Sequence, residues 1–255
     1  MKTIVLIHGM WSTSKTVDRL TVRMESFGYR VLAPNLPGHD PDHPDRTEAQ
    51  GTRSIHDYAE SISRFLDSEA LEQPPILLGH SMGGLIAQKV AASRPTGPVI
   101  LLNPAPPRGI NTIYWSAARA TLNVLLSPVF WRKPHCPSYP RARYGLFNCL
   151  PESDARRIHQ SLIQESGRAY FEIVFWFLDR RRVTEVDPKR MRVPMLVITG
   201  LRDRIVPDNV VRRVARRYPQ AKFVCYPDNA HWLFEEPGSD RVISDIHEWL
   251  KQATR

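Results

Sequence analysis

The segment LGHSMGGL, residues 78–85, places one serine among three glycines. A tight turn would explain these glycines. So would a nucleophile elbow, in which a serine occupies a sharp bend between a strand and a helix. The two interpretations differ in what they demand of the flanking sequence, because an elbow needs a buried strand directly before Ser81 and a helix directly after it.

The flanking sequence meets both demands. The run PILLG (75–79) is short and apolar, as is typical of a buried strand, and residues 83–93 have the apolar spacing of a helix. Gly79 and Gly83 leave room at the strained bend, where a side chain would collide with the backbone. A G-x-S-x-G match alone is a weak signal, but in this setting it makes Ser81 a candidate nucleophile.

Short apolar runs alternate with helical patterns along most of the chain. Strands are expected at 3–7, 29–34, 75–79, 98–103, 194–200 and 222–226, and helices at 14–27, 54–70, 83–93, 208–217 and 240–252. Because the strands are apolar throughout, they predict a parallel sheet that helices cover on both faces. The predicted fold class is therefore α/β, with a six-stranded parallel sheet.

Residues 104–190 break this rhythm. They open with PAPPRG, contain no clear strand, and carry helical apolar runs at 113–126 and 168–178 on either side of a proline-rich middle. We expect this stretch to be a helical cap inserted after the fourth strand. Residues 1–103 and 191–255 would then form the core domain.

A serine hydroxyl needs a base to become a nucleophile, and the base needs an orienting carboxylate. In a parallel sheet these groups are expected just beyond the carboxyl ends of the strands. Asp203 lies in GLRDRIVP after the fifth strand, and His231 lies in YPDNAHW after the sixth. Ser81, Asp203 and His231 are therefore the predicted catalytic residues. Asp208 is the competing acid, but it stands where a helix N-cap is expected.

Four other histidines could compete for the role of base. His247 falls inside the predicted terminal helix, where a surface position is expected. His8 and His80 each adjoin a glycine turn, so we expect them to brace loops by hydrogen bonds. His39, in PGHD, is expected to close its own loop.

The motifs together resemble the α/β-hydrolase superfamily. The chain has G-H-S-M-G-G at the elbow, G-x-x-D-x-x-V-P around the acid, His-Trp after the last strand and His-Gly after the first, spanning residues 7–232. The resemblance implies a serine esterase or lipase-like enzyme with a helical cap and no cofactor. It also implies an oxyanion hole formed by the backbone N–H groups of Met10 and Met82.

The chain departs from the family pattern in two ways. Its first predicted strand corresponds to the family's usual third strand, a feature that plant methylesterases and hydroxynitrile lyases share. Its nucleophile is serine rather than aspartate, which argues against dehalogenase and epoxide hydrolase chemistry. The implied function is cleavage of carboxylic esters through an acyl-enzyme. The alternatives are a C–C bond hydrolase, a lactonase, a thioesterase, a hydroxynitrile lyase, or a ligand receptor with a hydrolase fold.

Aromatic residues near the predicted site are candidates for lining a substrate pocket. Trp11 follows the first His-Gly turn, and Trp232 follows the predicted base. Phe175 and Trp176 belong to the run YFEIVFWFL (170–178) in the predicted cap. Core packing is the alternative role for each of them.

Composition limits the classes of partner. The chain has 255 residues and a net charge of +9, but its aromatic residues lie in apolar runs rather than between lysines, so nucleic acid binding is not expected. The three cysteines are few and lack metal spacing, which indicates free thiols in a reducing compartment. Because the N-terminus has no signal-peptide pattern, the sequence predicts a soluble cytoplasmic protein.

One cluster of potential metal ligands occurs near the second strand. Asp42, His43 and Asp45 lie close together, but prolines interrupt the run. We interpret it as a solvated loop and predict no metal site.

The positive charge is concentrated in the predicted cap. Residues 108–190 carry fourteen Arg and Lys against seven Asp and Glu. A solvated face is one explanation. The other is that the cap attracts an anionic group, which could belong to an ester substrate, to a fatty acid product or to an acidic lipid surface. Contact with a membrane surface therefore stays open as an alternative.

Overall fold

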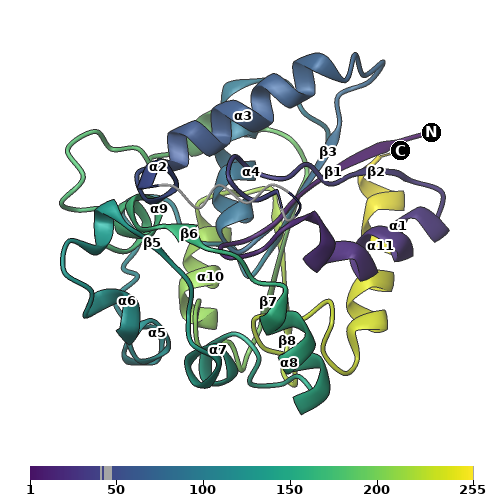
Figure 1. Ribbon diagram of the computed structural model, residues 1–255. Helices are drawn as coiled ribbons and strands as arrows, with labels where there is room; N and C mark the ends of the chain where they lie inside the picture. The colour runs from purple at the N-terminus through teal and green to yellow at the C-terminus, as the bar shows by residue number, and fades with distance from the viewer. Residues whose placement is uncertain (41, 43–47, 255) are drawn as a thin grey trace.

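The computed structural model describes residues 1–40, 42 and 48–254. Within this part of the chain, six parallel strands form one sheet in the order β2-β1-β3-β4-β7-β8 (Figure 1). The strands are β1 (Thr3–Ile7), β2 (Arg30–Leu32), β3 (Ile76–His80), β4 (Val99–Leu102), β7 (Met195–Gly200) and β8 (Ala221–Tyr226). Each corresponds to a predicted strand, so the predicted α/β fold with six parallel strands is confirmed.

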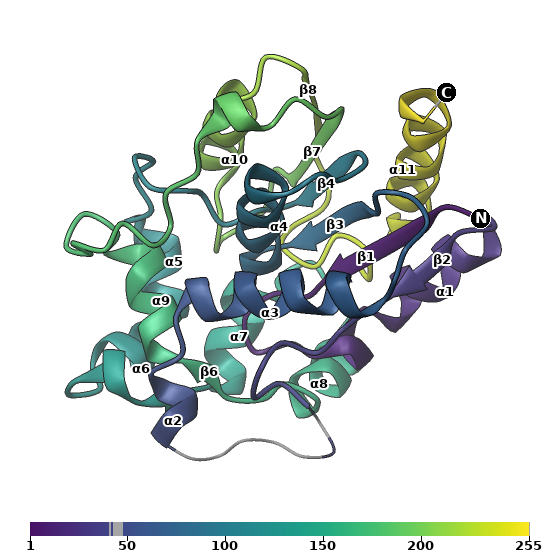
Figure 2. The same cartoon turned by 90° about the horizontal axis from the view of Figure 1, so that it is seen from above.

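Helices cover both faces of the sheet, as Figure 2 shows from above. One face carries α3 (Ile55–Ser68), α4 (Met82–Ser93) and α10 (Asp208–Arg216), and the other carries α1 (Asp18–Ser26) and α11 (Ser239–Ala253). Alternate residues of β1 supply the two cores: Val5 and Ile7 point into the first, and Ile4 and Leu6 into the second. Both faces of the central strands are therefore buried, which is why these strands are largely apolar, whereas the edge strands β2 and β8 carry the exposed residues Arg30 and Lys222.

The starts of two helices show how the local sequence decides their form. Ser54 caps α3 as predicted, since its Oγ accepts from the His56 N–H at 3.1 Å and Asp57 accepts from the Ser54 N–H at 2.8 Å. The helix expected at 14–27 begins instead as a 3-10 turn, η1 (Ser14–Val17), and continues as α1. A short helix that was not predicted, α2 (Glu48–Gly51), precedes α3.

Residues 104–190, which we call the cap segment, lie at the carboxyl end of the strands (Figure 1). They form α5 (Trp115–Ala120), α6 (Leu122–Leu125), η2 (Phe130–Arg132), β5 (Pro134–His135), α7 (Tyr139–Gly145), α8 (Glu152–Gln160), β6 (Glu165–Ser166), α9 (Gly167–Val174) and η3 (Pro188–Arg190). The predicted run 113–126 contains α5 and α6, and the predicted run 168–178 overlaps α9, which begins one residue earlier and ends at Val174. The antiparallel β5–β6 pair, α7 and α8 were not predicted. Pro140 is compatible with α7 because it occupies the first turn, where no backbone donor is needed.

Two buried carboxylates join the cap segment to the core. Glu165 of β6 accepts from the Tyr58 hydroxyl at 2.7 Å and lies 3.0 Å from His39 Nε2. Glu172 of α9 accepts from the Ser54 hydroxyl at 2.9 Å, at the N-terminus of α3. These contacts hold the cap segment over the edge of the sheet where the predicted catalytic residues lie.

Candidate active site

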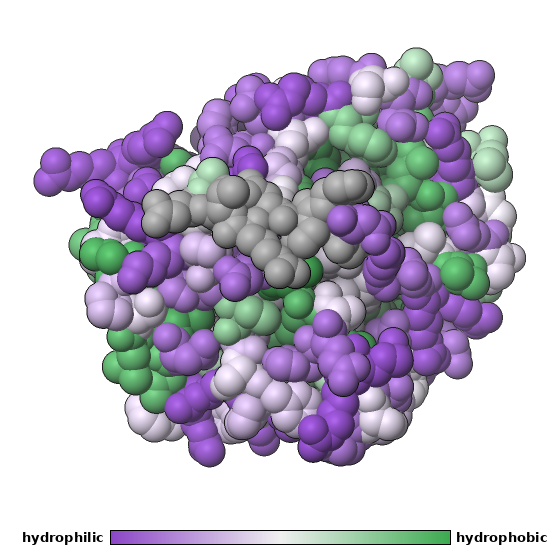
Figure 3. All heavy atoms as spheres, in the orientation of Figure 1, coloured by the Kyte–Doolittle hydropathy of each residue, from purple (hydrophilic) through white to green (hydrophobic). Residues whose placement is uncertain are grey.

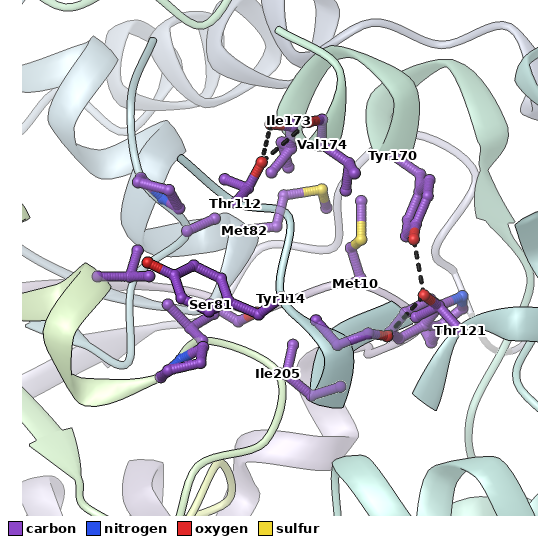
Figure 4. Close-up of a pocket in the computed structure, with 17 residues that line it drawn as sticks. Met10, Ser81, Met82, Thr112, Tyr114, Thr121, Tyr170, Ile173, Val174 and Ile205 are labelled. Atoms are coloured by element: carbon purple, nitrogen blue, oxygen red, sulfur yellow. Dashed lines mark hydrogen bonds between the residues drawn. The ribbon is translucent and has the colours of Figure 1, made fainter. Parts of the chain in front are cut away.

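Ser81 occupies the bend between β3 and α4. Its backbone has φ 53° and ψ −120°, outside the regions that a non-glycine residue ordinarily adopts. The Ser81 N–H donates to Leu102 O at 2.9 Å. The Ser81 carbonyl accepts from the N–H groups of Gly84 at 2.9 Å and Ala105 at 2.8 Å. The surrounding backbone therefore holds the strained conformation and presents the side chain to a pocket (Figure 4).

The glycines around Ser81 have a steric cause. A Cβ at Gly83 would lie 2.1 Å from Ile7 O and 2.5 Å from His8 O, and a Cβ at Gly79 would lie 2.3 Å from Gly83 O. These separations are far below van der Waals contact, and the atoms approached belong to the backbone. Neither position accepts a side chain unless the end of β1 or the start of α4 moves.

The structure pairs His231 with Asp203. The Nδ1–H of His231 donates to Asp203 Oδ2 at 2.7 Å, and both side chains are buried. The other carboxylate oxygen of Asp203 accepts from the N–H groups of Ile205 at 2.7 Å and Val206 at 3.0 Å. Asp208, the competing acid, begins α10 and pairs with Arg212 at 3.5 Å. The geometry therefore gives Asp203 the orienting position beside the histidine.

Ser81 and His231 come from neighbouring regions of the same sheet edge but are not hydrogen bonded. Among the described residues, neither Ser81 Oγ nor His231 Nε2 makes a hydrogen bond. The His80 ring lies 4.9 Å from the His231 ring, between centroids, and His80 directly precedes Ser81. A serine–histidine contact therefore needs a change of side-chain conformation, as is common in unliganded active sites.

Two polar residues that the sequence analysis did not identify clamp the loop carrying His231. Glu236 accepts from the N–H groups of Ala230 at 2.6 Å and Trp232 at 3.1 Å, on either side of the histidine. Asn103 Nδ2, just after β4, donates to the carbonyl oxygens of Ala230 at 2.8 Å and His231 at 3.0 Å. Burial raises the pKa of the Glu236 carboxyl above its ordinary value. The loop is thus held through its backbone from both sides.

The other histidines serve as braces or lie elsewhere. His8 Nδ1 donates to Gly9 O at 3.0 Å while its Nε2 accepts from the Leu36 N–H at 3.1 Å, and burial, with neighbouring His39, lowers the pKa of His8 to about 3. His80 Nε2 donates to His231 O at 2.9 Å, and burial holds the pKa of His80 well below its ordinary value.

His39 and His247 also lie outside the proposed chemistry. His39 contacts its own loop at Pro37 O, as predicted, but its other nitrogen faces Glu165 of the cap segment. His247 stacks on Phe27 at the far side of the sheet, with ring centroids 4.2 Å apart.

The two residues predicted to supply the oxyanion donors both line the pocket. Met82 is the first residue of α4, so its N–H has no partner within the helix. Met10 follows Gly9 in a tight turn, where the Ser12 N–H donates to Gly9 O at 3.3 Å. Neither the Met10 nor the Met82 N–H donates to any residue that the structure describes, and both residues line the pocket. Two unused donors beside a serine are suited to stabilise a developing alkoxide.

The pocket beside Ser81 holds about 620 Å³ of open space, part of it continuous with solvent. It is lined by Met10, Trp11, Ser81, Met82, Ala105, Pro106, Thr112, Tyr114, Ala117, Thr121, Tyr170, Ile173, Val174, Ile205, Val206, Pro207 and Val210. None of these described lining residues is charged. The Thr112 hydroxyl donates to Val174 O at 2.9 Å, and the Thr121 and Tyr170 hydroxyls pair at 2.7 Å (Figure 4). The pocket is therefore apolar, and these hydroxyls are already paired within its wall.

Of the four predicted pocket residues, Trp11 lines the pocket and three do not. Trp232 packs in the core against Phe147, with ring centroids 5.2 Å apart. Phe175 stacks on Phe171 at 5.7 Å, outside the lining. Trp176 donates from Nε1 to a backbone carbonyl, Ile110 O, at 2.9 Å.

Several other sequence-based predictions concern the surroundings of the site. Asp42 pairs with Lys15 at 3.0 Å, while His43 and Asp45 of the same cluster lie outside the described residues. Cys136, Cys149 and Cys225 are free thiols.

Comparison with known proteins agrees with the fold described above. A model of the Alpha/beta hydrolase family matches residues 4–244. The Magnesium-chelatase 30 kDa subunit of Rhodobacter capsulatus is 26% identical over 263 residues, which cover 97% of this chain and 86% of that protein. The pimeloyl-(acyl-carrier protein) methyl ester esterase of Yersinia pseudotuberculosis is 22% identical, covering 91% of this chain and 86% of that protein.

The solved structure of the methylesterase MES16 from Arabidopsis has a TM-score of 0.73, covers 98% of this chain and 99% of its own, and is 14% identical, so the likeness is one of fold. Other distant relatives and structural neighbours are named as a diacylglycerol lipase, an esterase and a meta-cleavage product hydrolase. Because the family model extends from β1 into α11, the chain belongs to the alpha/beta hydrolase family.

Proposed function

We propose that this protein is a serine hydrolase that cleaves carboxylic esters through Ser81, His231 and Asp203. The observation that carries the proposal is the buried bond of 2.7 Å between His231 Nδ1 and Asp203 Oδ2, at the same sheet edge as the strained Ser81. A carboxylate-oriented imidazole beside a serine on a sharp bend supplies a base and a nucleophile.

The reaction begins when His231 Nε2 takes the Ser81 proton as Oγ attacks the ester carbonyl carbon. The Met10 and Met82 N–H groups donate to the oxyanion that forms. When the tetrahedral intermediate collapses, the alcohol leaves with the proton from His231. Water, deprotonated by the same histidine, then attacks the acyl-enzyme and releases the acid. The first step requires a side-chain movement that brings Ser81 Oγ within hydrogen-bond reach of His231 Nε2.

The pocket supports an ester with an apolar acyl or alcohol part. Its lining is uncharged, so an anionic group on the substrate would remain outside it. Residues 104–190 act as a helical lid over a core domain of residues 1–103 and 191–255. Two distant relatives are named as a methyl ester esterase and a diacylglycerol lipase, and both names denote enzymes that cleave ester bonds. This supports the proposed reaction class.

The decisive experiment is covalent labelling with a fluorophosphonate, followed by mass spectrometry of the labelled peptide. We expect the label on Ser81. Ser81→Ala should lose the label and about 10⁴-fold or more of its ester hydrolysis, because the catalytic residues act as a unit. Ser93→Ala, at the other end of α4, is the matched control and should behave like the parent protein. Activity within tenfold of the parent in Ser81→Ala would show that Ser81 is not the nucleophile.

A substrate panel separates ester cleavage from the reactions that share these residues. p-Nitrophenyl esters of increasing acyl length are compared with lactones, thioesters and a ring-cleavage product with a scissile C–C bond. The proposal expects the highest kcat/KM among the esters. A ligand receptor would instead take up one label without sustained turnover of any substrate, and that result would overturn the proposal.

A further inference from the structure

The cap segment exposes an unusual share of the apolar surface. Ten large hydrophobic side chains are exposed in the described part of the chain, and seven of them belong to this segment. They are Ile113, Trp115, Leu126, Val129, Trp131, Phe177 and Leu178, which we call the cap patch. Trp115 is 81% exposed and Leu178 is 58% exposed. Apolar groups gathered on a surface in this way mark a contact site more often than chance exposure.

A chain of ring contacts connects two members of the cap patch, Trp131 and Phe177. The Trp131 ring lies 6.3 Å from Phe171, which lies 5.7 Å from Phe175, and Phe175 lies 6.3 Å from Phe177. The segment carrying Ile113 runs beside the end of α9, where the Thr112 hydroxyl donates to Val174 O.

The figures agree with this continuity. Figures 1 and 2 both place α5, α6 and α9 together at the left of the molecule. Figure 3 shows hydrophobic side chains, in green, reaching the surface at the left, over α5 and α6.

Positively charged side chains that form no ion pair with a described residue lie next to members of the cap patch in the sequence. Arg132 and Lys133 follow Trp131, and Arg180 and Arg181 come shortly after Leu178; all four are exposed, and none forms an ion pair with a described residue. The neighbouring acid, Asp179, is turned inward.

Asp179 is buried and accepts from the N–H groups of Arg181 at 3.2 Å and Val183 at 2.8 Å. Glu172 of the same region is buried against Ser54. Among the described residues, the exposed surface thus combines apolar and positively charged groups, and the two carboxylates of Asp179 and Glu172 are buried rather than exposed on it.

Part of the cap patch, Ile113 and Trp115, is also the outer side of the pocket wall. Thr112 and Tyr114 line the pocket, whereas Ile113 and Trp115, which alternate with them, are exposed. At residues 112–115, a single segment of backbone therefore separates the apolar pocket from the apolar surface. A molecule that reaches the patch lies next to the space where the proposed reaction takes place.

We propose that the cap patch docks on an anionic lipid surface. Apolar side chains with tryptophan insert into the boundary between headgroups and acyl chains, and nearby arginines and lysines are attracted to acidic headgroups. Among residues 1–40, 42 and 48–254, no helix combines the length and the apolar character that crossing a bilayer requires, so the contact is peripheral. The protruding aliphatic side chains Ile113, Leu126 and Leu178 favour a lipid surface over a nucleic acid, which would use the charges and the aromatic rings but not these side chains.

The test is cosedimentation with vesicles of phosphatidylcholine, with and without phosphatidylglycerol. We expect binding to the anionic vesicles, weakened by added salt. Trp115→Ser combined with Leu178→Ser should reduce the partition coefficient at least tenfold. The matched control, Val22→Ser with Leu201→Ser, changes side chains that are 61% and 51% exposed elsewhere, and it should bind normally.

The charges are tested separately. Replacing Arg180 and Arg181 by Gln should weaken binding by about fivefold for each charge. Arg190→Gln with Arg192→Gln removes the same charge outside the patch and should have a smaller effect. Equal binding to both kinds of vesicle, or equal loss in patch and control variants, would overturn the proposal. So would binding to an acidic protein without binding to vesicles.

Docking and catalysis can fail independently. Ser81→Ala should dock like the parent protein, because Ser81 is not part of the patch. The patch variants should keep their fluorophosphonate labelling and their hydrolysis of short water-soluble esters. Labelling that persists without vesicle binding would therefore count against docking alone.

Discussion

Gly83→Ala offers a quantitative test of the way in which the elbow is built. A Cβ at this position would lie 2.1 Å from Ile7 O, which falls about 1.3 Å short of ordinary van der Waals contact near 3.4 Å. The same Cβ would lie 2.5 Å from His8 O. Both atoms are backbone, so the clash is relieved only if α4 and the end of β1 move apart by roughly 1 Å.

This displacement acts directly on the proposed oxyanion donors. Met82 begins α4, and Met10 lies just beyond β1, so the two N–H groups would separate along with the elements that carry them. A misplacement of about 1 Å costs roughly 10²-fold in rate. Overpacking of this kind also lowers the free energy of unfolding by about 1–3 kcal/mol.

The assay for Gly83→Ala is kcat and KM for a short p-nitrophenyl ester, with urea unfolding as the measure of stability. We expect kcat to fall about 10²-fold, since the lost interaction is made mainly in the transition state. Gly97→Ala is the control, because its Cβ would meet nothing closer than 3.1 Å, far from the site. A Gly83→Ala enzyme with parental kcat and stability would refute the steric account of the elbow.

Three further predictions follow from the site. Asp203→Asn should lower kcat by about 10⁴-fold because the histidine tautomer is no longer held, whereas Asp208→Asn should leave kcat within a few-fold; the reverse order would mean that the acid is Asp208. Burial raises the pKa of Glu236 above its ordinary 4.5, so the folded protein holds this proton to higher pH than the unfolded chain does, and the free energy of unfolding should fall as pH rises from 4.5 through the raised pKa. Glu236→Gln should lack that decline in urea titrations at a series of pH values, and parallel curves would disprove the linkage. Ala117→Phe fills the pocket and should reduce kcat/KM at least tenfold for long acyl esters while acetyl esters stay near the parental value; equal losses would show that the acyl chain lies elsewhere.

The sheet and the elbow were predictable because their signals are local. A strand buried on both faces is largely apolar, and β3, β4 and β7 show this over a few residues. The edge strands β2 and β8 carry the exposed residues Arg30 and Lys222 and were recognised from their remaining apolar positions. The steric demand on Gly79 and Gly83 likewise falls within two residues of Ser81.

Asp203 could be placed because a local alternative role, that of helix N-cap, was expected for Asp208. The structure has Pro207 at the N-cap and Asp208 as the first residue of α10, paired with Arg212, so the exact position was wrong by one residue.

The supporting residues could not be predicted, because their roles depend on distant backbone. Glu235 and Glu236 are adjacent and chemically identical, yet Glu236 turns inward to the His231 loop while Glu235 lies near Arg157 at 3.8 Å. The pocket aromatics posed the same problem. An apolar run predicts that a side chain is buried, but it does not tell whether the side chain packs in the core or lines the pocket. Trp232 packs in the core.

The buried carboxylates that join the cap segment to the core have a consequence for exchanging caps between proteins. The cap segment depends on core residues that lie far from it in the sequence. Glu165 and Glu172 find their partners in His39, Tyr58 and Ser54, more than a hundred positions earlier. A chimera cut at the two ends of the cap segment would carry Glu172 together with Arg168, which lies 2.7 Å away within the segment, but it would separate Glu165 from His39 and Tyr58. A buried carboxylate left without its partners costs several kcal/mol. The unit that could be transferred without stranding Glu165 is therefore the cap segment together with His39 and Tyr58 of the core.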